Sequence, residues 1–148
     1  MYCLPGSKSY YGVRIVNGSQ AASGTNDTGI HIILVGNNGC TEKIYLAGYW
    51  SVFGGVGSAS KYEDLVVQTD KKLRDVKVLL YGNDANWTGL FNNEWYVEFS
   101  VVYPLSSVGK DVEFPCYHWI GDGETISTTS ATSEHVLITN FHASMHYV

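Results

Sequence analysis

The chain has 148 residues, of which 45% are hydrophobic and 16% charged, with a formal net charge of −5. This length and balance are typical of one folded globular domain and exclude a disordered tail. The negative charge argues against a general affinity for nucleic acid, because binding to phosphates needs a positive field. We therefore expect a single domain over residues 1–148 and no nucleic-acid partner.

The N-terminus and the cysteines bear on location. No apolar run approaches the roughly 20 residues that cross a bilayer, and the first residues lack the apolar stretch of a signal peptide, so a cytoplasmic protein is expected. The chain has an odd number of cysteines, Cys3, Cys40 and Cys116, and no C-x-x-C motif. This favours buried thiols over a disulfide framework.

Three Asn-x-Ser/Thr triplets would be glycan acceptors in a secreted protein, so secretion stays open. The triplets begin at Asn17, Asn26 and Asn86.

Apolar residues alternate over strand-length stretches, beginning with residues 11–15 and 30–34. Because Ile33 and Val35 on the other face are also apolar, the second strand is expected to be central and covered on both faces. The Gly-Asn-Asn-Gly turn that follows readily takes positive φ, which predicts antiparallel pairing with residues 40–46.

Further strands are predicted at residues 62–67, 76–81, 95–103 and 112–120, with a terminal one at 135–139. The stretch 70–76 is short and charged, and alternation with period two returns from Val76 onward, so a loop or a single turn is predicted there. Trp95 is expected in the core. Strands at this spacing, without helical periodicity between them, predict an all-β fold, a sandwich of two antiparallel sheets.

Signatures of covalent and phosphate chemistry are missing from the sequence. There is no Gly-x-Ser-x-Gly motif, and the glycine cluster at residues 53–57 lacks the Lys-Ser/Thr ending of a phosphate-binding loop. His142 and His146 are four apart and could share a helical face as metal ligands, but no third ligand is near. His31 is expected to be a packed or solvent-facing strand residue.

Two polar clusters in predicted loops offer oxygen atoms to calcium, which takes six to eight of them. The first cluster is Gly24, Thr25, Asn26 and Asp27, and the second is Asn92, Asn93 and Glu94. If the two loops lie at one end of the sandwich, they could share an ion. The alternative is that the first cluster is only a turn, in which Asn and Asp bond to their own backbone.

Apolar residues also fall in predicted loops. They are Trp87, Leu90, Phe91 and Trp119. Such residues are either buried under the rim of the sandwich or exposed to a bilayer interface. Fully burying one such side chain contributes roughly 1.5–3 kcal/mol, so a few half-inserted residues would bind a membrane weakly and reversibly. A basic stretch forms a local positive patch or a solvated loop: Lys71, Lys72, Arg74 and Lys77.

Five longer segments follow one another along the chain: YGVRIVNGSQ at 11–20, ASGTND at 22–27, LVGNNGCTEK at 34–43, EWYV at 94–97 and EFPCYHWI at 113–120. In this order they resemble the PLAT (LH2, C2-like) domain of animal lipoxygenases, from about Tyr10 to Ile120. The resemblance implies a β-sandwich of about eight strands that docks an enzyme onto membranes, often with calcium, and contacts the catalytic domain.

The resemblance also shows where this chain departs from the family. The first calcium loop keeps one carboxylate, Asp27, the second corresponds to residues 51–56 and has lost both acidic ligands, and the third has Asn93 followed by Glu94. Weak or absent calcium binding is implied. The aromatic pair of the family's first loop is replaced by alanines at 21–22, whereas Trp119 matches a family tryptophan.

Nothing after Ile120 resembles the large helical domain in which lipoxygenases bind iron, so neither catalysis nor iron is expected. The resemblance implies a lipid-surface and partner-binding module, peripheral to membranes. It is either free-standing, which the tail at residues 137–148 favours, or the N-terminal regulatory domain of a lipoxygenase-like enzyme. The alternative is a protein-interaction or structural sandwich that binds neither lipid nor calcium.

Overall fold

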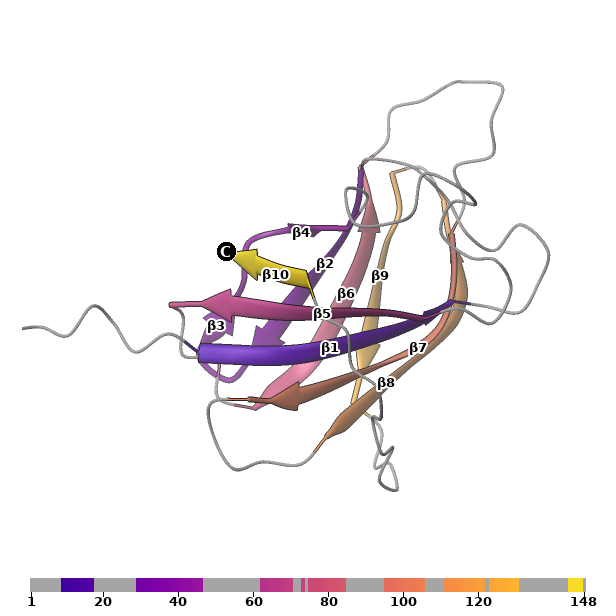
Figure 1. Cartoon of the computed structure of the whole chain (residues 1–148). Helices are drawn as coiled ribbons and strands as arrows, with labels where there is room; N and C mark the ends of the chain where they lie inside the picture. Colours follow the sequence, from indigo (N-terminus) through magenta and orange to yellow (C-terminus); the bar gives the residue numbers. More distant parts are fainter. Residues whose placement is uncertain are drawn as a thin grey trace, which may run out of the picture.

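The computed structural model describes residues 9–17, 29–46, 62–70, 73, 75–84, 95–105, 111–121, 123–130 and 144–147. Within these ranges the strands are β1 (Ser9–Asn17), β2 (Ile30–Gly36), β3 (Gly39–Cys40), β4 (Ile44–Tyr45), β5 (Tyr62–Thr69), β6 (Val76–Asn83), β7 (Trp95–Pro104), β8 (Val112–Ile120), β9 (Thr125–Thr129) and β10 (Ser144–Tyr147). They form two stacked sheets (Figure 1). Sheet A has the order β10-β5-β1-β7-β8, and sheet B has the order β3-β2-β6-β9 with β4 also paired to β2. The prediction of a β-sandwich is confirmed.

The strands predicted between residues 11 and 120 are present, and the described residues differ from the prediction in three ways. The strand expected at residues 40–46 is two short pieces, β3 and β4, both antiparallel to β2 as expected. Between the two pieces, the Thr41 hydroxyl accepts a hydrogen bond from the Leu34 amide. This side-chain bond takes the place of a backbone hydrogen bond between the strands. β9 was not predicted, and β10 pairs parallel with β5, so sheet A is not wholly antiparallel. The strand expected at 135–139 lies outside the described residues.

The core lies between the sheets and is formed by alternate residues of their strands. Trp95 is fully buried and meets Tyr81 edge to face, with ring centroids 5.9 Å apart. This confirms the expected core position of Trp95. Other fully buried side chains are Ile15, Ile30, Ile32, Leu34, Ile44, Leu46, Leu73, Leu79, Phe114 and Ile120. Such burial is the main stabilising contribution to the fold.

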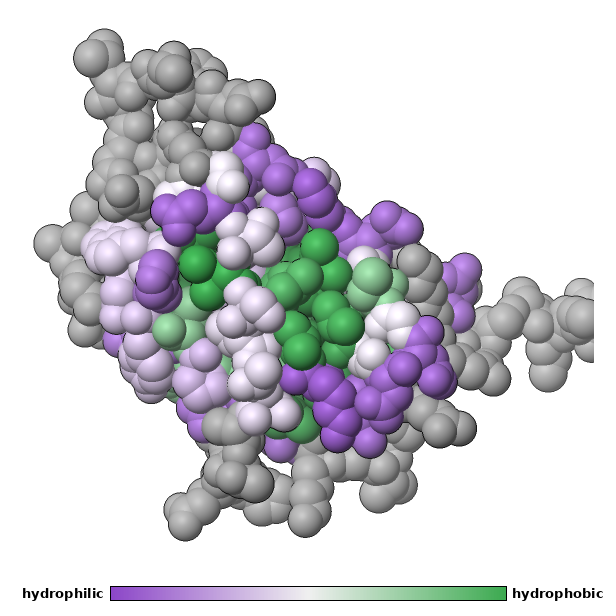
Figure 2. Space-filling view, turned by 180° about the vertical axis from the view of Figure 1, so that it is seen from behind, coloured by the Kyte–Doolittle hydropathy of each residue, from purple (hydrophilic) through white to green (hydrophobic). Residues whose placement is uncertain are grey.

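The outer face of sheet B carries a second apolar area. Ile33 lies opposite Leu80 and Val35 opposite Val78 across the β2–β6 pair, and all four are half-buried. Figure 2 shows green side chains gathered in the middle of one face. The prediction that β2 is covered on both faces is therefore wrong for its outer face within the described residues. No helix in the described part of the chain is long and apolar enough to cross a bilayer.

Candidate functional site at the connection end

The segments that carry most of the predicted site residues attach to one end of the sandwich. Residues 18–28 join β1 to β2, residues 47–61 follow β4 and precede β5, and residues 85–94 join β6 to β7. Antiparallel register places their attachment points together in each sheet. In sheet A, Val16 lies opposite Tyr62 and Asn17 opposite Val97, and in sheet B, Ile30 lies opposite Asn83. We call this end, defined by Asn17, Gly29, Leu46, Tyr62, Asp84 and Trp95, the connection end.

Two hydrogen bonds join residues that flank segment 18–28 to residues that flank segment 85–94. The Asp84 amide donates to the Gly29 carbonyl at 3.0 Å, so the residue after the first segment meets the residue before the second. The Trp95 indole Nε1 donates to Asn17 Oδ1 at 2.7 Å, so the residue before the first segment meets the residue after the second. The attachment points of both segments thus lie at one end, which is the condition for a shared ion.

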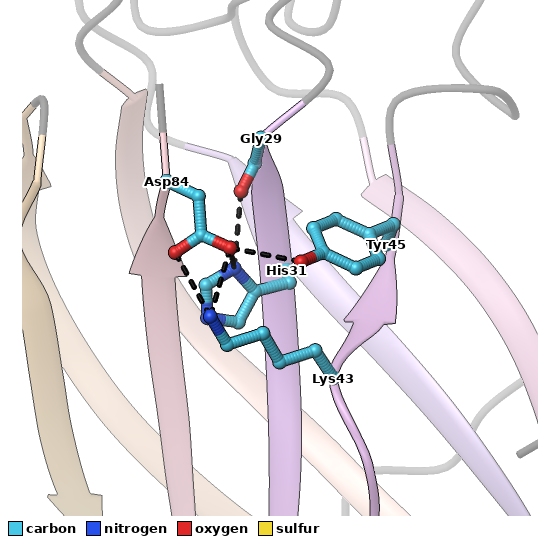
Figure 3. A network of polar contacts seen from close by, with 5 residues as sticks. All are labelled: Gly29, His31, Lys43, Tyr45 and Asp84. Atoms are coloured by element: carbon cyan, nitrogen blue, oxygen red, sulfur yellow. Dashed lines mark hydrogen bonds and ion pairs between the residues drawn. The ribbon is translucent and has the colours of Figure 1, made fainter. Parts of the chain in front are cut away.

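A polar network surrounds the Asp84 carboxylate (Figure 3). Lys43 Nζ donates to both of its oxygens, at 2.9 and 3.1 Å, and the Tyr45 hydroxyl donates to one of them at 2.9 Å. His31 Nδ1 lies 3.6 Å from the same oxygen and 3.0 Å from the Gly29 carbonyl. Because Tyr45 lies just ahead of segment 47–61, the network reaches the attachment points of all three segments.

The charges in this network support one another. The hydrogen bond from Lys43 lowers the pKa of Asp84, and the bond from Tyr45 lowers it further. The same carboxylate raises the pKa of Lys43. The pair is therefore charged at neutral pH. Since the Lys43 and Asp84 side chains are 46% and 39% exposed, water and salt screen their attraction, and it contributes little stability.

His31 is the buried member of the network. Its side chain is 1% exposed, and its ring meets Tyr45 edge to face at 5.5 Å between centroids. A Cβ at Gly82 would lie 2.3 Å from His31 Nε2, so glycine at this position leaves room for the ring. Of the two positions predicted for His31, packed or solvent-facing, the packed one is confirmed, and no pattern in the sequence indicates that His31 joins a network.

The contact between Asn17 and Trp95 is completely buried. Asn17 Nδ2 has no hydrogen-bond partner within the described residues, although the other amide atom is used. A buried, hydrogen-bonded Asn17 is not accessible to a glycan, so its triplet is not an acceptor in the folded chain. The triplets at Asn26 and Asn86 lie outside the described residues.

Of the predicted site residues, the structure describes only Trp119. Trp119 lies in β8 rather than in a loop and is half-buried against Tyr96, with ring centroids 5.2 Å apart. Its predicted loop position is wrong, and the period-two pattern of residues 112–120 was the signal for the strand. The other predicted residues lie outside the described ranges: Trp87, Leu90, Phe91, Gly24, Thr25, Asn26, Asp27, Asn93 and Glu94.

Two further predictions are corrected. His146 lies in β10, so it cannot share a helical face with His142. In the part of the chain that the structure describes, no three His, Cys, Asp or Glu side chains gather as metal ligands. Cys40 is exposed, whereas Cys116 is partly buried, and both are free thiols. Burial raises the pKa of Cys116 to about 11, so the expectation of buried thiols holds for Cys116 and is wrong for Cys40.

Comparisons with known proteins agree with this architecture. Residues 11–132 match the PLAT/LH2 domain model. Coral 8R-lipoxygenase, described as activated by calcium via a C2-like domain, has a TM-score of 0.65 and 21% identity over 82% of this chain. A calcium-dependent 11R-lipoxygenase gives 0.61 and 19% over 82%, and the alpha toxin of Clostridium absonum gives 0.60 and 16% over 85%. This chain spans 17% of each of these two lipoxygenases and 32% of the toxin.

Proposed function

The chain belongs to the PLAT/LH2 domain family, and on that premise we propose that it attaches to a lipid surface through the connection end and holds a partner there. A PLAT domain is non-catalytic by itself, so the proposed role is binding. The proposed lipid contacts are Trp87, Leu90 and Phe91. Trp119 is not among them, because it lies within β8 and is half-buried against Tyr96.

Two contacts between the residues that flank segments 18–28 and 85–94 support this proposal. The Asp84 amide donates to the Gly29 carbonyl, and the Trp95 indole donates to Asn17 Oδ1. The points where both segments join the sandwich therefore lie at the same end of the molecule. A single approach to a surface would use both segments.

We further propose that calcium contributes weakly. The ion would be held by six residues that provide only two carboxylates, too few for tight binding of a doubly charged ion. They are Gly24, Thr25, Asn26, Asp27, Asn93 and Glu94. Asp84, a described acid at this end, is already compensated by Lys43. The Lys43 ammonium group thus neutralises the Asp84 carboxylate, which a metal ion would otherwise neutralise.

Sedimentation with vesicles of neutral phospholipid tests this function. The wild-type chain is expected to pellet with vesicles, and Trp87→Ala with Phe91→Ala to reduce the bound fraction severalfold. Leu105→Ala is the matched control, because Leu105 is an exposed apolar residue bonded to Tyr10 at the opposite end of β1. We expect this control to bind like the wild type, and chelation of calcium to change binding little.

Absence of vesicle binding in every condition would overturn the lipid proposal and favour a module that binds only proteins. Equal losses in Leu105→Ala and in the double variant would show that the connection end has no special role. A complete loss on chelation would refute the weak contribution of calcium.

A further inference from the structure

β9 forms the edge of sheet B, and in the described part of the chain no further strand pairs with it beyond β6 (Figure 1). Its sequence is TISTT. It pairs with β6 in an unbroken antiparallel register, from Val78 opposite Thr129 to Gly82 opposite Thr125. Thr125, Ser127 and Thr129 are exposed. β9 is therefore a regular edge strand with a row of hydroxyl side chains.

The hydrogen bonds at the two ends of β9 show which backbone groups face outward. The Asn83 amide donates to the Glu124 carbonyl at 3.0 Å, and the Ser130 amide donates to the Lys77 carbonyl at 3.3 Å. Even-numbered residues therefore turn their amide and carbonyl groups toward β6. Because these groups alternate between the two sides of an antiparallel strand, those of Thr125, Ser127 and Thr129 point away from β6.

The other edge strands carry features that hinder pairing with another chain. β3 and β4 have two residues each and β10 has four, and short edges give little to pair with. β8 has a register shift opposite β7, contains Pro115, and has Tyr117 at a φ of 49°. Bulges and proline also block an added strand. β9 has no proline, charged residue or register shift, so it is the edge suited to pairing.

We propose that two copies of this chain associate by antiparallel pairing of β9 with β9, about a two-fold axis beside Ser127. A two-fold interface uses the same surface of both copies, so the strand must complement itself. With Ser127 opposite Ser127 of the second copy, Thr125 lies opposite Thr129 of the second copy, and each outward amide meets a carbonyl. The facing side chains are all hydroxyls, and such cross-strand pairs stabilise antiparallel sheets.

The charges beside β9 fit this arrangement. The chain has a net charge of −5, so two copies repel each other unless they meet through an uncharged surface, which β9 provides. In the paired register Glu124 lies opposite Ser130 of the second copy, and Lys77 is the β6 neighbour of that serine. Glu124 and Lys77 are exposed. Each end of the paired strands therefore brings an acid of one copy toward a lysine of the other.

Antiparallel pairing also fixes the directions of the two connection ends. β9 begins near the connection end, with Thr125 opposite Gly82, and runs away from it to Thr129. The second copy is turned end over end, so the two connection ends point in opposite directions. If the lipid binding proposed above holds, on which this step rests, the dimer bridges two lipid surfaces.

Crosslinking through a single engineered cysteine tests the register. Two residues facing each other in a hydrogen-bonded antiparallel pair have Cα atoms about 5.5 Å apart, within the roughly 4.4–6.8 Å that a disulfide spans. In a Cys3→Ser, Cys40→Ser background, Ser127→Cys should therefore form a disulfide-linked dimer under mild oxidation. Thr125→Cys is the matched control, because the two copies of residue 125 lie about 13 Å apart along the strands. Equal crosslinking of the two variants would overturn the proposal.

Sedimentation equilibrium without lipid measures the association itself. We expect the mean mass of the wild type to rise toward that of a dimer with concentration. Ser127→Lys places like charges opposite each other and should weaken the dimer severalfold, whereas Leu105→Lys, at an exposed site on sheet A, should not. Amide spectra verify the fold of each variant. A wild type that stays monomeric throughout, or equal effects of the two lysines, would overturn the proposal.

Turbidity of a vesicle suspension tests the bridging. Ser127→Lys should pellet with neutral phospholipid vesicles like the wild type but cluster them less. Clustering equal to that of the wild type would count against pairing through β9. Failure of every variant to pellet bears only on the lipid proposal, because the crosslinking and sedimentation measurements contain no lipid.

Discussion

Two contacts between distant residues lie at the connection end, one inside the sandwich and one on its surface. The buried contact is the hydrogen bond between Trp95 and Asn17, and the exposed one is the ion pair between Lys43 and Asp84. Water can replace the exposed partners when the pair is broken. Removing one buried partner leaves a polar atom without any hydrogen bond, which costs more. The buried hydrogen bond is therefore expected to contribute more to the free energy of unfolding than the exposed ion pair.

This difference divides the connection end into two parts. On the side of sheet A, the attachment points are fixed by packing around Trp95. On the side of sheet B, the network around Asp84 orients the attachment points while adding little to the free energy of unfolding. We expect substitutions around Trp95 to unfold the chain. Substitutions around Asp84 are expected to change the arrangement of the connecting segments while the fold stays intact.

The largest effect is expected for Trp95→Ala. Removing this fully buried ring leaves a cavity beside Tyr81 and should lower the free energy of unfolding by about 3–5 kcal/mol, measured by urea denaturation. Trp119→Ala, which truncates a half-buried ring in the neighbouring strand, should cost clearly less. Equal losses in the two variants would contradict the division between buried and exposed parts.

The two described thiols extend the comparison to reactivity. With a pKa of about 11, Cys116 is about one-thousandth thiolate at pH 8, and burial also blocks the reagent. In a Cys3→Ser background, Cys40 should therefore react with a thiol reagent on the order of 100-fold faster than Cys116, followed by mass spectrometry. Similar rates would show that β8 opens readily, since opening of this strand would expose the partly buried Cys116 fully.

Trp95→Phe isolates the buried hydrogen bond. Phenylalanine keeps most of the ring volume but removes the donor to Asn17 Oδ1, so we expect a loss of roughly 1–3 kcal/mol. Because Asn17 Nδ2 already has no partner among the described residues, replacing both partners by Trp95→Phe with Asn17→Leu should cost less than the sum of the single variants. Simple additivity in this double-mutant cycle would mean that the two side chains are not coupled.

The smallest effects are expected for Asp84→Asn and Lys43→Met. Lys43 lowers the pKa of Asp84 in the folded chain, so the ion pair's contribution is present above the unfolded pKa of about 4 and is lost as pH falls through the lower folded value. Asp84→Asn should therefore narrow slightly the difference between the thermal midpoints at pH 7 and pH 3. A large drop in the midpoint at pH 7 would show that the exposed pair stabilises as strongly as the buried one.

The strands that could be predicted are those whose pattern is local. Alternation around Ile32 and around Val97 identified β2 and β7, because one face of each packs into the core whatever its neighbours are. β9, with the sequence TISTT, has little apolar content. It forms because β6 offers an edge, with Tyr81 paired to Ile126. β10 is likewise defined by its pairing with β5.

An all-β fold can be predicted from the sequence because alternation and turn residues lie within a few positions of one another, and the family resemblance rests on equally short motifs. Other features appear only in the folded chain: Asn17 is buried against Trp95, 78 residues away, Lys43 pairs with Asp84, and Tyr117 is exposed in β8. These features depend on the register between distant strands. Register is set by the summed contacts of whole sheets, so no single segment encodes it.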